Sequence, residues 1–189
     1  MSRLVAAIVT AGLVASTTAP AAVAAEWTVD EDSRSLTWSV RFEQRQMEGE
    51  FADFSAAITF DPADLAGSHV SVTVTIPSVA TETPEFTAEM QKPDWFDAET
   101  FPTASFEATI FRSLGDDAYE ADGTLTIRDQ AQPVTLPFTF AIDGDRAEIA
   151  GALTIDRLDF GVGQGDWQID DVIGFDVAIA FSLSATRAD

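Results

Sequence analysis

Eight segments of the chain alternate apolar with polar residues, and this period of two constrains the fold more than any other feature. Side chains of a β-strand point alternately to opposite faces, so such a segment forms a strand with one buried and one solvated face. The predicted strands are residues 36–42, 51–60, 70–76, 104–110, 119–127, 134–142, 147–155 and 175–183.

Three shorter features complete this prediction. Residues 26–30 are expected to form a short separate strand or arm, and the mostly polar residues 44–48 a turn. The second long strand is expected to bend near Asp53. Thr83 and Pro84 predict the start of a short helix, with Thr83 as the capping side chain and Pro84 at the first helical position.

Eight strands with short turns and one helix favour an all-β fold, an antiparallel closed barrel with an apolar interior. Closure leaves no unpaired strand edge, which suits a chain that has no cysteine and therefore no disulfide. A barrel of this size is either filled by its own side chains or holds one small ligand.

The first 25 residues read as a signal peptide. Arg3 precedes a mostly apolar stretch, and small residues at 22–25 offer cleavage after Ala24 or Ala25. We therefore expect an exported, periplasmic protein with a single domain at residues 26–189.

The charge is strongly negative. Aspartate and glutamate number 32 against 10 lysines and arginines, giving a formal net charge of -22. Such a surface repels nucleic acid and anionic membranes. We also hypothesise adaptation to a saline habitat, where salt screens the repulsion. A melting temperature that failed to rise with NaCl would count against it.

Catalytic and metal-binding patterns are weak. His69, the only histidine, follows Ser68, but neighbouring strand residues point to opposite faces and no Gly-x-Ser-x-Gly elbow is present. Zinc needs several His or Cys ligands. No catalytic residue, metal site or resident cofactor is expected. Two acidic sets, Asp143/Asp145/Glu148 and Asp166/Asp170/Asp171, could bind a hard cation, but their spacing does not match that of a calcium-binding loop.

A glycine-rich segment, residues 161–165, lacks the lysine of a phosphate-binding loop and is expected to be a strand connection in which glycine permits positive φ. Trp95, Phe96 and Phe101 lie within a segment that also holds two prolines. Three large apolar groups are too many for a solvated loop, so they either plug one end of the core or line the mouth of a cavity.

Four segments in order carry a resemblance to a known family: residues 60–65 through 76–81, 95–98 through 101–106, 123–128 with 133–137, and 156–163. Together they resemble the YceI-like family of exported, lipocalin-like, polyisoprenoid-binding proteins. The Trp-Phe-Asp and Gly-Val-Gly-Gln-Gly-x-Trp variants look closest to members associated with cytochrome b561. Unlike many members, the chain has no histidine in residues 42–45.

The resemblance implies an eight-stranded barrel with a tunnel for an isoprenoid lipid of quinone or polyprenyl type, and no established catalysis. The residues expected to line the tunnel are Phe42, Phe51, Phe54, Phe106, Phe138, Phe160 and Phe181, and those expected at its mouth are Trp95, Phe96, Phe101 and Trp167. Each has core packing as its simpler interpretation.

Other interpretations stay open. The chain can be an accessory partner of a cytochrome b561-type membrane protein with a filled, non-binding barrel. The interpretation as an outer-membrane barrel is not supported, because the sequence lacks the regular aromatic girdles expected of that class. An enzyme has little support from the residues above. Whether the protein forms a homodimer is left open.

Overall fold

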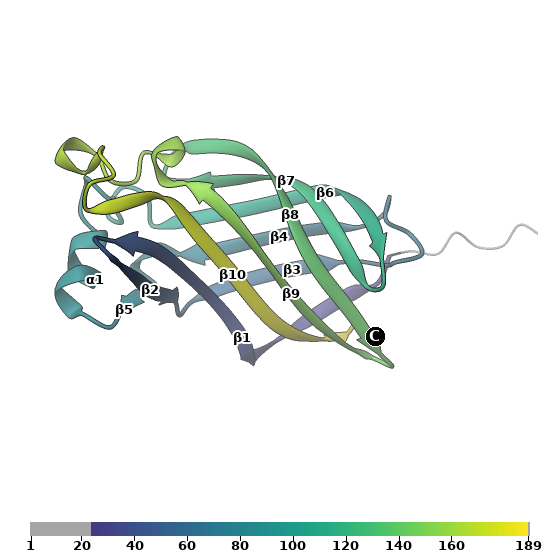
Figure 1. The fold of residues 1–189 in the computed structure, drawn as a ribbon. Coiled ribbons are helices and arrows are strands. Elements are labelled where there is room, and N and C mark those ends of the chain that lie inside the picture. Colours follow the sequence, from purple (N-terminus) through teal and green to yellow (C-terminus); the bar gives the residue numbers. More distant parts are fainter. Residues whose placement is uncertain (1–23, 189) are drawn as a thin grey trace, which may run out of the picture.

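The computed structural model describes residues 24–188, which form one sheet of ten strands with a short helix (Figure 1). The strands are β1 Glu26–Phe42, β2 Arg45–Phe51, β3 Phe54–Thr59, β4 His69–Thr75, β5 Val79–Thr81, β6 Thr103–Gly115, β7 Ala118–Ile127, β8 Gln130–Asp143, β9 Arg146–Asp156 and β10 Ile173–Arg187. The helix is α1 Pro84–Met90, and the 3-10 turns are η1 Ile76–Ser78, η2 Arg157–Phe160 and η3 Gly165–Trp167. Within this part of the chain, no helix has the length and apolar character needed to cross a membrane.

The sheet closes on itself through β1. Its last residues pair with β2, its first residues pair with β3, and β10 pairs along most of its length. Only Ala52 and Asp53 separate β2 from β3, and η1 separates β4 from β5, so each pair acts as one bent strand around the barrel. Counted in this way, the predicted eight-stranded antiparallel barrel is confirmed, including the bend near Asp53.

The predicted division of the N-terminal region was wrong. Residues 26–30 do not form a separate arm, because β1 is a single strand of 17 residues. Its pairing with β10 shifts register between Val29 and Arg34, which is a β-bulge where the backbone amide of Asp32 donates to Asp30 Oδ1 at 3.1 Å. The bulge interrupts the alternation of side chains while the strand continues.

The predicted turn at residues 44–48 was also wrong, because β2 begins at Arg45. The turn consists of Glu43 and the residue after it, and Glu43 has a φ of 54°. The inward positions of β2 are Met47, Gly49 and Phe51, and Gly49 hides the alternation in the sequence. A Cβ on Gly49 would overlap the ring of Trp38, so glycine is the residue that lets this tryptophan lie against β2.

The helix begins at Pro84 as predicted, but Thr83 makes no capping hydrogen bond with its side chain. The hydroxyl of Thr81 instead accepts a hydrogen bond from the Thr83 amide at 3.2 Å. This hydroxyl and that of Thr87 lie 3.1 Å apart, which attaches α1 to β5.

Two clusters of buried side chains divide the barrel along its length. The filled-end cluster lies with the chain ends and the β8–β9 turn, and includes Trp27, Phe60, Phe111, Tyr119 and Phe140. The mouth-end cluster lies at the opposite end of the barrel, where α1 and the segment that follows β9 are found (Figure 1). It includes Trp38, Val40, Ile76, Met90, Trp95, Phe96 and Phe160.

Candidate ligand-binding cavity

A cavity of ≈ 260 Å³ lies inside the barrel. Every long strand contributes side chains to its wall, because the inward positions of all of them are apolar. Besides the indoles, the polar residues among those that line it are Thr37, Glu89 and Arg157. The predicted apolar interior is therefore confirmed, and it is not completely filled by the barrel's own side chains.

Ten of the eleven residues predicted to bind the ligand lie at this cavity. They are Phe42, Phe51, Phe54, Trp95, Phe96, Phe106, Phe138, Phe160, Trp167 and Phe181. This places their side chains where a ligand would contact them, while their role in binding stays a prediction.

Phe101 is the exception, because it is not among the residues that line the cavity. Asp97 has a φ of 50° and its carbonyl accepts a hydrogen bond from the Phe101 amide at 2.8 Å, so the chain turns sharply between the two residues. Phe101 is half-buried outside the cavity, where the guanidinium of Arg128 lies 5.3 Å from the centre of its ring.

Several lining residues were missed by the sequence prediction. They include Trp38, Phe60, Phe86, Phe111 and Phe140. The period-two pattern carried the signal for three of these, Trp38, Phe60 and Phe140, because they share an inward strand face with residues that were chosen. Phe111 is out of step with Phe106 and faces inward because the pairing of β6 with β7 shifts register between Ala108 and Ile110. Phe86 lies on α1, and only its packing against Phe42, with ring centres 5.2 Å apart, brings it to the cavity.

The mouth is closed by aromatic pairs. Trp95 and Trp167 lie with ring centres 5.3 Å apart, and Phe51 and Phe96 with ring centres 5.7 Å apart. Trp95 and Phe96 are both buried and both line the cavity. These rings are both buried core side chains and part of the cavity wall near α1. That they form the mouth through which a ligand enters stays a prediction.

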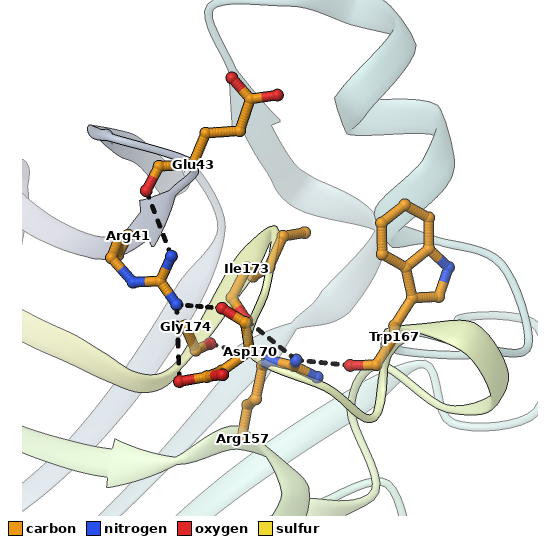
Figure 2. A network of polar contacts seen from close by, with 7 residues as sticks. All are labelled: Arg41, Glu43, Arg157, Trp167, Asp170, Ile173 and Gly174. Carbon is orange, nitrogen blue, oxygen red and sulfur yellow. Dashed lines mark hydrogen bonds and ion pairs between the residues drawn. The ribbon is translucent and has the colours of Figure 1, made fainter.

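A buried arginine holds the segment that follows η2. Arg157 is only 3% exposed, and its guanidinium has no carboxylate within salt-bridge distance among the described residues (Figure 2). All of its hydrogen bonds go to backbone carbonyls of residues further along the chain: Gly174 at 2.9 Å, Val162 at 2.9 Å, Gly163 at 3.2 Å, Trp167 at 2.6 Å and Ile173 at 3.3 Å.

The surroundings of Arg157 fit this role. Burial lowers the pKa of its guanidinium, and Asp156 partly opposes this. The centres of the Trp95 and Phe175 rings lie 5.7 and 5.5 Å from the guanidinium carbon. Gly163, with a φ of 85°, leaves the space that the guanidinium occupies, since an added Cβ would overlap Nη1. The prediction of positive φ in this loop is confirmed at Gly163 and its glycine neighbours.

Two further arginines fasten the same end. Arg41 donates to the carbonyls of Asp170 and Glu43 (Figure 2). Arg128 donates to three carbonyls, those of Pro93 at 2.8 Å, Gly161 at 3.2 Å and Trp95. The loops around the mouth are thus joined to one another by arginine side chains and backbone carbonyls.

Comparison with known proteins identifies the family. The YceI-like domain matches residues 27–185. The chain belongs to the YceI-like family. A UPF0312 protein of Pseudomonas aeruginosa is 30% identical over 154 residues, which cover 77% of this chain and 80% of the relative.

Solved structures agree with this assignment. BcnA of Burkholderia cenocepacia is 33% identical, with a TM-score of 0.81 and coverage of 84% of this chain and all of BcnA. A polyisoprenoid binding domain from Saccharophagus degradans, implicated in plant cell wall breakdown, has a TM-score of 0.67 at 14% identity, over 88% of this chain and all of that domain. At that identity the likeness concerns the fold alone.

The residues considered for catalysis do not converge in this YceI-like barrel. The Ser68 hydroxyl is buried and donates to the Asp64 carbonyl at 3.0 Å. His69 is exposed on the outer face, with Nε2 3.6 Å from Glu107. Within residues 24–188, no group of three or more His, Asp or Glu side chains is arranged to hold a metal ion, and neither of the two acidic sets forms one.

Three indole nitrogens of the barrel differ in their surroundings. Trp27 Nε1 at the filled end donates to the Phe60 carbonyl at 2.9 Å. Trp38 Nε1 and Trp95 Nε1 at the mouth end are buried and have no hydrogen-bond partner in the described part of the chain. A buried donor without a partner is uncommon in folded proteins.

Proposed function

We propose that this YceI-like protein binds a long isoprenoid lipid, of quinone or polyprenyl type, inside its barrel. The observation that carries the proposal is the cavity of ≈ 260 Å³ with its almost wholly apolar wall. Removing apolar surface from water contributes roughly 25 cal/mol per Å² before the costs of ordering the ligand. A flexible, unsaturated hydrocarbon chain presents only apolar groups to such a wall.

The size of the cavity bears on how the lipid enters. Cavities for drug-sized molecules typically measure about 300–1,000 Å³, so one of ≈ 260 Å³ accommodates part of a long tail as it stands. The remainder requires side chains to move, and two of those at the mouth, Phe86 and Trp167, are half-buried. We expect the lipid to enter between α1 and the loop held by Arg157.

Binding rather than catalysis fits the residues at the cavity. The family and the polyisoprenoid binding domain of Saccharophagus degradans support a binding protein. The polar lining residues Thr37, Glu89 and Arg157 each bond to another group of the protein, so they are committed to structure.

We also propose export to the periplasm through cleavage of the first residues. The signal peptide lies outside the described residues except at its end. The Ala25 carbonyl accepts a hydrogen bond from the Phe60 amide at 2.8 Å, and this bond is retained if cleavage follows Ala24. N-terminal sequencing of protein from the periplasm is expected to begin at Ala25; a start at Met1 would count against export.

The decisive experiment is native mass spectrometry of protein purified from its own cells, followed by identification of the released lipid. We expect one prenyl lipid per barrel, and a higher melting temperature when delipidated protein is given a prenyl quinone. An empty barrel whose melting temperature is unchanged by prenyl compounds would overturn the proposal.

A second expectation comes from the motifs that resemble cytochrome b561-associated members. If the protein serves such a membrane partner, the cytochrome should co-purify with it from detergent extracts. Solitary behaviour in these extracts would leave lipid binding as the single proposed role.

A further inference from the structure

The cavity has few polar groups, and most of them are already engaged. The Thr37 hydroxyl donates to the Ala180 carbonyl at 3.4 Å. The Glu89 carboxylate accepts from Lys92 at 2.5 Å. The five N–H groups of Arg157 match five hydrogen bonds to backbone carbonyls. The hydroxyl of Thr37 and the N–H groups of Arg157 therefore cannot donate to a ligand without breaking a bond within the protein, and the Glu89 carboxylate only accepts.

The indole N–H groups of Trp38 and Trp95 are the exception. Each residue is 6% exposed, each lines the cavity, and both belong to the mouth-end cluster. Neither nitrogen has a partner within residues 24–188. An unsatisfied buried donor destabilises a protein, so two of them on one apolar wall indicate that a hydrogen-bond acceptor enters from outside the chain.

Trp27 shows that a buried indole N–H can find a hydrogen-bond acceptor within this fold. Its Nε1 donates to the Phe60 carbonyl at 2.9 Å at the filled end, away from the cavity wall. The unpaired donors are thus confined to the tryptophans that face the cavity. Indole N–H is a donor only, so its partner on the ligand must be an acceptor such as a carbonyl oxygen.

The charges near the cavity indicate that this acceptor is uncharged. Glu89 contributes a carboxylate to the lining, and the chain carries a formal net charge of -22. Arg157 is cationic, but backbone carbonyls occupy its donors. An anionic phosphate would therefore meet a carboxylate and lose its hydration without gaining a charged hydrogen bond.

We infer that the indole N–H groups of Trp38 and Trp95 bind the oxygens of an uncharged, carbonyl-bearing head group, and so make the barrel prefer a prenyl quinone to a prenyl hydrocarbon or a prenyl phosphate. This rests on the proposed function, because the prenyl tail supplies the apolar contact. The two tryptophans act as specificity-determining residues at the mouth, while the aromatic and aliphatic wall is indifferent to the head group.

The test compares three probes with the same four-isoprene tail: a benzoquinone, a phenyl hydrocarbon without oxygen, and a monophosphate. Calorimetric titration of the delipidated, processed protein is expected to show the quinone binding about fivefold or more tighter than the hydrocarbon, the effect of one neutral hydrogen bond. Trp38→Phe and Trp95→Phe should each weaken quinone binding about fivefold and leave hydrocarbon binding unchanged.

Trp27→Phe is the matched control, because it removes an indole N–H that the protein already satisfies and that is not part of the cavity wall. It should lower the melting temperature and keep the preference for quinone. Trp38→Phe and Trp95→Phe should do the reverse: the preference for quinone is lost, and the melting temperature falls less than in Trp27→Phe.

Infrared spectroscopy gives a readout that packing alone would not move. The carbonyl stretch of the bound quinone should lie at lower frequency in the wild type than in Trp95→Phe. Equal binding of quinone and hydrocarbon, tighter binding of the phosphate, or a preference that survives in both variants would overturn the inference while leaving the proposed function in place. If none of the probes bound, the proposed function itself would fail, and the inference with it.

Discussion

The two ends of the barrel are built from the same inward alternation and differ in how their side chains meet. At the filled end, Phe60 is 1% exposed and contacts four other aromatic rings, with ring centres 4.5 to 5.7 Å away. At the mouth, the aromatic rings meet as separate pairs, such as Phe42 with Phe86 and Trp95 with Trp167. The filled end is a connected core that forms one part of the cavity wall, whereas the aromatic rings of the mouth pack as separate pairs.

Polar groups follow the same division. The buried indole of the filled end bonds to a backbone carbonyl, while two indoles of the mouth have no partner among residues 24–188. The mouth is instead held by Arg157 and its backbone carbonyls. The comparison teaches that one end of this barrel supplies a connected aromatic core and the other retains unpaired donors that a ligand can use, while both ends contribute to the cavity wall.

The largest expected effect comes from Phe60→Ala. Removing a fully buried phenyl ring leaves a cavity at the centre of the filled-end cluster, at a cost of about 3–5 kcal/mol of unfolding free energy. Phe86→Ala, at the half-buried mouth, is the control and should cost less while weakening lipid binding. Urea denaturation measures both, and equal losses would contradict the division between the ends.

Arg157→Met is expected to act at the mouth alone. It keeps much of the side-chain length but leaves buried carbonyls without donors, at a cost of roughly 3 kcal/mol. Hydrogen exchange should accelerate in residues 161–174 and stay slow at Phe140. Arg157→Lys should not restore protection, because one ammonium cannot reach carbonyls that lie around a planar guanidinium. Uniform acceleration along the chain would show that the ends are not independent.

Filling the cavity should separate binding from folding. Ala56 lines the cavity, and the next residue, Ala57, is exposed on the outer face of β3. Ala56→Phe is expected to weaken prenyl quinone binding by about tenfold or more. Displacing about two buried methylene groups of the ligand, at ~0.8 kcal/mol each, already exceeds the ~1.4 kcal/mol that changes affinity tenfold. Ala57→Phe adds the same ring outside and should leave affinity unchanged. Calorimetric titration checks the pair, and similar affinities would place the ligand elsewhere.

A smaller effect distinguishes the indoles. Trp27→Phe loses one buried hydrogen bond and leaves the Phe60 carbonyl unpaired, so the free energy of unfolding should fall by about 1–3 kcal/mol. Trp95→Phe removes a donor that has no partner in the described chain, so its loss of stability should be smaller. Chemical denaturation of the lipid-free protein would show the opposite order if the unpaired state of Trp95 were not real.

The smallest effect is expected on the outer surface near the filled end. Hydrogen bonds from Arg112, and from the Thr135 hydroxyl, lower the pKa of Asp122. A lowered pKa in the folded state stabilises the protein above the ordinary pKa of aspartate and is lost as pH falls through the lowered value. Arg112→Gln should raise the pKa of Asp122, measured by NMR titration, with little change in melting temperature, because the pair is solvent-exposed. An unchanged pKa would contradict the ion pair.

The sequence by itself determined the barrel and its apolar interior. Alternation along each strand defines which residues face inward, and it does so without knowledge of the partner strands. The same local information located the tight turn between β8 and β9, where Gly144 has a φ of 62°, and the positive-φ glycines around Gly163. Ten of the eleven residues chosen from the sequence lie at the cavity wall, because most of them lie on the apolar face of a strand.

The tertiary structure decided the features that depend on distant partners. β2 is a strand because β1 and β5 pair with it, although its side chains look like those of a turn. Phe101 leaves the cavity because of one turn at Asp97, and Arg157 loses its surface character because carbonyls from residues 162–174 surround it. Whether an inward aromatic fills the barrel or leaves space depends on which rings face it across the interior. The closure of the sheet sets which rings face one another across the interior, and no local sequence pattern shows this.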